Sequence, residues 1–194
     1  MDSAMTLVNS RLLLVALVAL PAAACQTKDL PPQPNFVSSA DGGAAPQKKD
    51  ERYFIEFRSR YALSYGHTYA VFGRLDRAGK MIDPQVAGLH PASNSAVPYV
   101  LGHFVPVPAE TGWSDGDLEE PYRSASWQII LTRAEYDKVV AYIRKLQASS
   151  HVWQATVLNC NGFVADIAHS MGYKTPAIQL RPQQFITELR KMNT

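Results

Sequence analysis

Cys160 combines a reactive side chain with a position that would activate it. It opens the segment LNCNGFVADIAHSMG, whose apolar residues repeat at helical spacing up to Gly172. A thiol in the first turn of a helix meets unpaired N–H groups and the positive end of the helix dipole, and both favour the thiolate. The same N–H groups can hold the oxyanion that forms when a thiolate attacks a carbonyl. We therefore expect a nucleophilic cysteine with a lowered pKa; a small buried residue of the core is the alternative.

A nucleophilic thiol needs a base, and five histidines are present. His169 lies nine residues beyond Cys160 on the same helix, more than two turns away, which is too far to reach it. His151 stands in a polar segment typical of a surface. His67 follows Gly66 and opens an aromatic, β-branched segment that reads as a strand. Because the end of a strand can set an imidazole against a helix N-terminus, His67 is the expected general base.

These segments together resemble a known family. Gly66-His67 at a strand start, a hairpin, and Asn-Cys-x-x-Phe-Val from Asn159 at a helix start are similar to the permuted NlpC-type papain-like group, which includes relatives of lecithin–retinol acyltransferase. The resemblance covers about residues 60–175, and the histidine precedes the cysteine, as in the permuted members. It implies a thiol hydrolase or acyltransferase with Cys160 as nucleophile and His67 as base.

The family's third residue orients the histidine from the next strand, at the end of a motif like Gly-x-x-Ile-His. The matching stretch here runs from Gly79 to Asp83, so the resemblance gives Asp83 the orienting place. A carboxylate can accept a hydrogen bond from one ring nitrogen and steady the imidazolium. His90 and His103 are rivals for this role, and a turn residue before Pro84 is the structural alternative for Asp83.

The elements around these residues indicate the fold class. Strands are expected over 52–59, 68–75, 80–86, 99–107 and 126–131, with loops over 88–95 and 109–124. Helices are expected from Thr132, which forms a capping box with Glu135, from Asn159 or Cys160, and from Pro182. Strands first and helices later predict an α+β domain with an antiparallel sheet packed on helices. The resemblance makes this a circularly permuted papain-like fold.

The N-terminus reads as an export signal. Arg11 precedes an apolar run over 12–20, and small residues lead to Cys25, so residues 1–24 are expected to be a signal peptide. The residues before Cys25 fit the cleavage site of an ordinary signal peptidase. They also resemble a lipoprotein box, in which Cys25 would be acylated. A retained anchor is the alternative, although the run is short for a bilayer span. Residues 25–50 are rich in proline and glycine and are expected to be a flexible tether. Gln26 resembles the residue that sends lipoproteins to the outer membrane; a soluble periplasmic or secreted protein remains the other possibility.

Residues 51–194 are then the folded domain. The chain has 194 residues, of which 46% are hydrophobic and 19% charged, and its net charge is +2. These values exclude a disordered chain and argue against a nucleic-acid partner. The spacings of His67, His90, His103 and Cys160 match no compact metal motif, so no metal and no cofactor are expected. The acidic residues of the 109–124 loop are expected to face water: Asp115, Asp117, Glu119 and Glu120.

The sequence therefore predicts an exported cysteine hydrolase, an amidase, endopeptidase or acyltransferase, that acts through a Cys160–His67 dyad on cell-envelope substrates. A cell-wall peptide and a lipid ester are both open as its substrate. The alternative is a catalytically silent envelope lipoprotein that uses the same fold for binding. We expect the 109–124 loop to border the site, with Trp113 as an apolar contact.

Overall fold

A computed structural model describes residues 30–39, 52–62 and 65–194. The expected signal peptide, together with residues 25–29 and 40–50 of the expected tether, lies outside the described residues. No helix in the described ranges is both long and apolar enough to cross a membrane.

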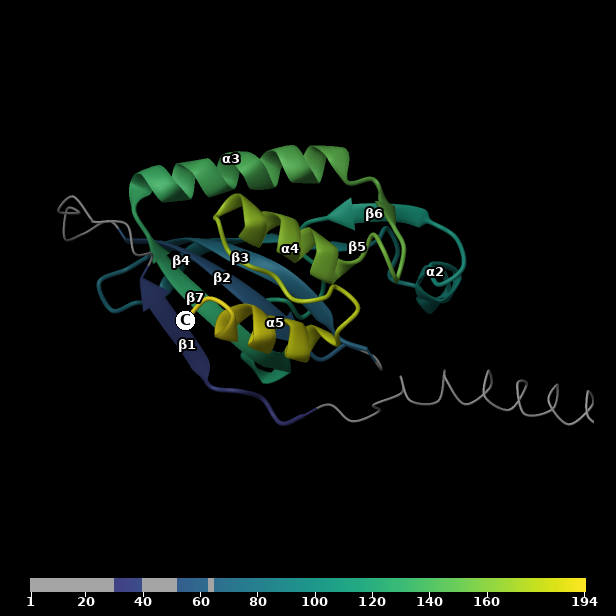
Figure 1. Ribbon diagram of the computed structural model, residues 1–194, viewed down its shortest axis with the longest axis horizontal. Helices are drawn as coiled ribbons and strands as arrows, with labels where there is room; N and C mark the ends of the chain where they lie inside the picture. Colours follow the sequence, from purple (N-terminus) through teal and green to yellow (C-terminus); the bar gives the residue numbers. More distant parts are fainter. Residues whose placement is uncertain (1–29, 40–51, 63–64) are drawn as a thin grey trace, which may run out of the picture.

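A five-stranded sheet with the order β1-β7-β2-β3-β4 forms the centre of the molecule (Figure 1). The strands β2 (Arg52–Arg60), β3 (His67–Leu75), β4 (Met81–Ala87) and β7 (Arg123–Leu131) pair antiparallel. The edge strand β1 (Asn35–Ser39) pairs parallel with β7. The sheet is therefore mixed, and the expected purely antiparallel sheet is corrected.

Strand β1 also corrects part of the expected tether. Its side chains alternate between half-buried and exposed, and Phe36 packs against the core. The Trp127 indole N–H donates to Ser38 Oγ at 3.0 Å. The proline-rich composition around β1 concealed a short strand that is held by its partner β7 and by this side-chain contact.

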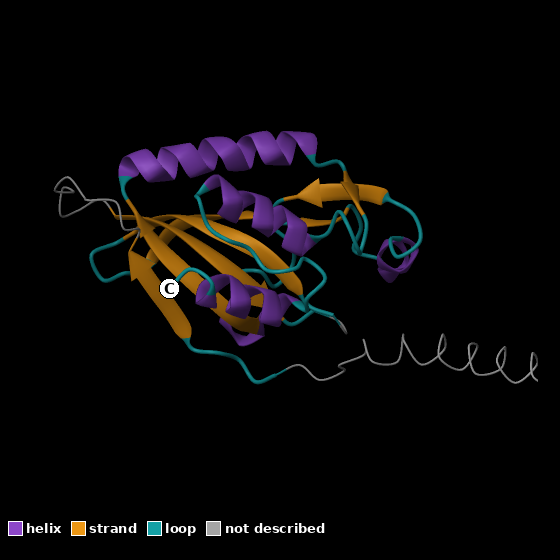
Figure 2. Ribbon diagram, in the orientation of Figure 1, coloured by secondary structure: helices purple, strands orange, loops and turns teal. Residues whose placement is uncertain are grey.

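Three helices cover one face of the sheet: α3 (Arg133–Ser149), α4 (Cys160–Ser170) and α5 (Pro182–Lys191) (Figure 2). Their starts follow the local signals: Thr132 and Glu135 form the capping box, and Pro182 occupies the first turn of α5. Buried side chains from alternate positions of the strands meet the helices in one core, which includes Ile55, Phe57, Phe72, Trp127, Ile143, Phe163, Ile167 and Phe185.

The opposite face of the sheet has a smaller cluster of buried residues that includes Phe54, Tyr69 and Val71. Residues 112–122 fold over the part of this face nearest to His67. Asp117 is fully buried there, where it accepts a hydrogen bond from Arg60 Nε at 2.6 Å. Its carbonyl accepts from the Tyr69 hydroxyl at 2.6 Å. The expected water-facing acidic loop is thus corrected at Asp117, whose carboxylate ties the loop to the sheet.

A smaller sheet lies at one end of the molecule and contains β5 (Leu89–Pro91), β6 (Val107–Thr111) and β8 (Val152–Trp153). Between β5 and β6 stands α2 (Ala96–Leu101), where a strand was expected over 99–107. Ser95 caps α2 by accepting from the Val97 N–H, and Gly102 ends the helix against Trp153. The aromatic and β-branched composition of residues 99–107 predicted a strand. The Ser95 cap and the packing of Gly102 against Trp153, which comes much later in the sequence, favour a helix instead.

Candidate active site

Cys160 is the first residue of α4 and is buried, with 6% of its surface exposed. The preceding Asn159 caps the helix, because its side-chain oxygen accepts from the Gly162 N–H at 2.9 Å. The expected helix and the place of the cysteine in its first turn are confirmed. The flanking asparagines, however, are buried and do not form an accessible helix start.

Strand β3 and helix α4 are fastened together by the residues that follow His67 and Cys160. The Thr68 hydroxyl donates to Asn161 Oδ1 at 2.9 Å. The Asn161 amide group donates to the carbonyls of Ile178 and Leu180 at 2.9 and 2.7 Å. Hydrogen-bonding groups of Thr68 act to lower the pKa of the Cys160 thiol. Thr68 thus faces α4, whereas His67, the preceding residue of the strand, faces the opposite side of the sheet, where it stacks on Tyr69.

His67 is buried and has a second histidine beside it. Ala70 pairs with Ala87, and continuing this antiparallel register toward the strand end sets His90 opposite His67. The two rings meet edge to face, with their centroids 6.0 Å apart at 85°. His67 also stacks on Tyr69, two residues along the same face of β3, at 5.5 Å.

Both histidines have a buried Nε2 without a hydrogen-bond partner in the described part of the chain. The Nε2 of His67 is therefore not bonded to the Cys160 sulfur. Gly88 lies against this atom: a Cβ there would stand 2.9 Å from Nε2 of His67. Any side chain at position 88 would press on the ring, so the glycine keeps this space open. An unpaired buried nitrogen is costly, so two of them at facing rings are unusual.

Asp83, the expected orienting residue, lies elsewhere on the sheet. It is exposed and forms part of a bulge in β4 opposite Gly73, six residues along β3 from His67, which corresponds to about 20 Å. Its φ of 45° is in the left-handed region, which aspartate tolerates better than most residues. The structure therefore gives Asp83 a place in the bulge and brings His90 to His67. The other rival, His103, is exposed in the segment after α2.

The thiol and the imidazole are both neutral in this site. Burial is the largest cause that raises the pKa of the Cys160 thiol, against an opposing effect of hydrogen bonds from Thr68 and from backbone N–H groups. Burial, followed by the charges of Arg60 and His90, lowers the pKa of His67 well below its ordinary value. The expected lowering of the thiol pKa is thus corrected, because desolvation outweighs the helix N-terminus.

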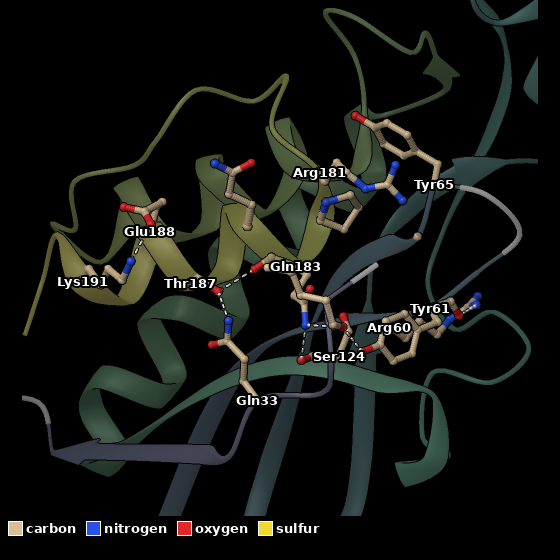
Figure 3. Close-up of a pocket in the computed structure, with 14 residues that line it drawn as sticks. Gln33, Arg60, Tyr61, Tyr65, Ser124, Arg181, Gln183, Thr187, Glu188 and Lys191 are labelled. Atoms are coloured by element: carbon tan, nitrogen blue, oxygen red, sulfur yellow. Dashed lines mark hydrogen bonds and ion pairs between the residues drawn. The ribbon is translucent and has the colours of Figure 1, made fainter. Parts of the chain in front are cut away.

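Two cavities flank the site without including Cys160 or His67. The first, of about 360 Å³, is lined by Arg60, Tyr65, Gly66 and residues of α5, among them Gln183 (Figure 3). The Arg181 guanidinium lies over the Tyr65 ring, 5.7 Å from its centroid. The second cavity, of about 320 Å³, lies on the other side of the start of α4 and is lined in part by Leu158, Asn159 and Gly162. The first cavity thus lies next to the residue that precedes His67, and the second next to the residue that precedes Cys160.

The 112–122 segment approaches the site from the face on which His67 lies. It contacts Arg60 and Tyr69, which are neighbours of His67, through Asp117. Trp113 is 57% exposed and stands on this segment. The expected role of the loop as a border of the Cys160 site remains a prediction, since its contacts run to the neighbours of His67.

The sequence indicated Cys160 and His67 but not the residues around them: Thr68, Gly88, Arg60 and Asp117. His90 was expected only as a rival of Asp83 for the orienting role. The pairing of His90 with His67 depends on the strand register, which the spacing alone does not give.

Among the described residues, no three His, Cys, Asp or Glu side chains gather into a group that could hold a metal ion. Comparisons with protein-family models, curated proteins and solved structures found no match for this chain.

Proposed function

We propose that this protein is an exported cysteine hydrolase or acyltransferase in which Cys160 attacks the carbonyl carbon of an amide or ester. The observation that carries the proposal is the pair of facing histidines with unpaired Nε2 atoms, at the start of the strand that Thr68 ties to the cysteine helix. Unpaired buried nitrogens are rare in a purely structural core. A proton-transfer site has a use for them, because the ring must be free to take up and release a proton.

In the proposed reaction, the Cys160 sulfur forms a bond to the carbonyl carbon while its proton moves to His67. The carbonyl oxygen becomes an oxyanion, which the free N–H groups at the start of α4 can stabilise. The bond to the leaving group breaks as His67 returns the proton to it, which leaves a thioester on Cys160. Water or another acceptor, deprotonated by His67, then attacks the thioester and restores the thiol.

His90 would orient His67 in this scheme. The Nδ1 of His90 lies 3.1 Å from the Pro91 carbonyl oxygen, which can only accept, so we assign a proton to Nδ1. In the proposed scheme the Nε2 of His90 acts as an acceptor for an N–H on the Nε2 of His67. In this proposal a bridging water joins the two Nε2 atoms and leaves the other nitrogen of His67 to take the thiol proton.

The permuted papain-like fold belongs to the same proposal. Its support is the chain order, with His67 before Cys160, and the packing of α4 against β3 through Thr68 and Asn161. We propose that the protein is exported and carries a lipid on Cys25. The compartment favours amides of cell-wall peptides as substrates, with lipid esters as the enzymatic alternative.

The raised pKa of Cys160 and the absence of a bond from its sulfur to Nε2 of His67 favour a second candidate, a silent envelope lipoprotein that binds through the same surface. Incubation of the purified chain with peptidoglycan fragments and, separately, with phospholipids separates the candidates, with Cys160→Ala as the blank. Peptide release that needs Cys160 supports the amidase; fatty-acid release alone supports the ester enzyme. Binding without turnover in both samples favours the silent protein.

A further inference from the structure

One end of the molecule exposes apolar side chains around α2. We call residues 92–106, which contain α2, together with the neighbouring segment 154–158, the α2 lobe. Figure 1 shows α2 at the extremity of the molecule, beyond β5 and β6. The large apolar side chains of the lobe that face solvent are Val97, Val100, Leu101, Phe104, Val105, Val157 and Leu158, and Phe104 is 80% exposed. Soluble proteins rarely gather so many such residues without a partner.

The two segments of the lobe are held rigidly to one another. The Ala155 N–H donates to the Gly102 carbonyl at 3.0 Å. The Trp153 ring packs against Gly102 so closely that a Cβ there would lie 2.2 Å from it. Tyr99 meets the same ring with centroids 5.7 Å apart. The exposed apolar side chains are therefore presented on a fixed surface, stabilised from beneath by Trp153.

The lobe also lacks charge. Residues 84–109 and 146–165 contain no Asp, Glu, Lys or Arg, in a chain in which 19% of residues are charged. Protein-binding surfaces usually surround their apolar centre with a polar and charged rim. A surface whose own segments carry no charge is suited to enter the apolar boundary of a lipid layer, where each charge would have to be desolvated.

The N-terminal end of the described chain lies close to the residues that precede His67. Leu30 contributes to the cavity lined by Tyr65 and Gly66, the residues that precede His67. Cys25 is five residues from Leu30, a span of at most about 18 Å. A lipid on Cys25 would therefore hold the His67 end of the sheet near the membrane, and the α2 lobe begins two residues after His90, which faces His67.

We propose that the α2 lobe docks on a phospholipid bilayer, with Phe104 and Val100 inserted among the acyl chains. The surface itself does not depend on the cysteine chemistry. A Cys160→Ala chain is therefore expected to bind vesicles as the wild type does, which keeps this inference distinct from the proposed function.

The test is flotation of the chain with vesicles of phosphatidylethanolamine and phosphatidylglycerol. The chain begins at Gln26, so that neither the apolar run over 12–20 nor a lipid on Cys25 contributes. Phe104→Ser is expected to weaken partition about 10–100-fold, as expected for loss of one buried aromatic side chain. The matched control is Val37→Ser on β1, whose side chain is 62% exposed on a different element and should leave partition unchanged. Equal melting temperatures establish that both variants fold.

Salt separates apolar docking from attraction to anionic lipid. Because the lobe is uncharged, partition should persist when the salt concentration rises from about 0.1 M to 1 M, where surface charges are strongly screened. Loss of binding at high salt, absence of binding, or equal binding by Phe104→Ser would overturn the proposal. So would a dimer that Phe104→Ser converts to a monomer, because a second copy of the chain would then be the occupant of the lobe.

Discussion

Asn161 offers a quantitative test of how the cysteine helix is held in place. Its side chain is 1% exposed and makes three hydrogen bonds, with Thr68, Ile178 and Leu180, at 2.7–2.9 Å. At about 1 kcal/mol net for each bond, Asn161→Ala should lower the free energy of unfolding by about 3 kcal/mol. With an m-value of about 1–3 kcal/mol/M, the urea midpoint should fall by about 1–3 M.

A double-mutant cycle isolates the bond between strand and helix. Thr68→Val should cost about 1 kcal/mol alone, and the coupling between Thr68→Val and Asn161→Ala should be about 1 kcal/mol. Asn193 is the matched control, because it makes three similar bonds, with Lys174 and Leu189, in a half-buried position near the C-terminus. Asn193→Ala should cost clearly less. A loss below about 1 kcal/mol for Asn161→Ala, or a coupling near zero, would refute this reasoning.

Three further predictions follow from buried or strained groups. Asp117→Asn should destabilise the protein by about 3–5 kcal/mol in urea unfolding, because it leaves the Arg60 guanidinium of a buried ion pair uncompensated; a loss below 1 kcal/mol would contradict this. Asp83→Val should cost about 1–2 kcal/mol because β-branched residues resist the left-handed φ, whereas Asp83→Asn should change neither stability nor turnover; loss of turnover in Asp83→Asn would restore the expected catalytic role. The pKa of His67 is lowered on folding, so its contribution to stability is present above about pH 6.5 and is lost as the pH falls. The difference in stability between wild type and His67→Gln should therefore shrink below pH 6.5, and a difference that grows there would show the opposite sign of the pKa shift.

The helices were predictable because their signals are local. Thr132 and Glu135 satisfy backbone groups within one turn, and Pro182 can only begin a helix or break one. The place of Cys160 at a helix start followed from the same kind of evidence. The α2 segment was misread because the residue that fixes its end, Trp153, comes about fifty residues later in the chain.

The third site residue shows where spacing alone is insufficient. Asp83 occupies the motif position, but the bulge in β4 moves the register of the strand by one residue. Only beyond that bulge does the pairing bring His90 opposite His67. The pKa of Cys160 was misjudged for a related reason: the helix start was visible in the sequence, whereas its burial depends on the packing of α4 against β3.

Acylation with 4-nitrophenyl acetate shows whether Cys160 is a nucleophile served by His67. The full chain with Cys25→Ser leaves Cys160 as its single thiol, and mass spectrometry locates the acetyl group. We expect a burst of nitrophenolate, an acetyl thioester on Cys160, and acylation slowed about 10²–10⁴-fold in His67→Gln. The control is His169→Gln. His169 lies on the same helix as Cys160 but is exposed, so this variant should react as the parent does. Equal acylation rates for His67→Gln and the parent, or no acetyl group on Cys160, would contradict the account.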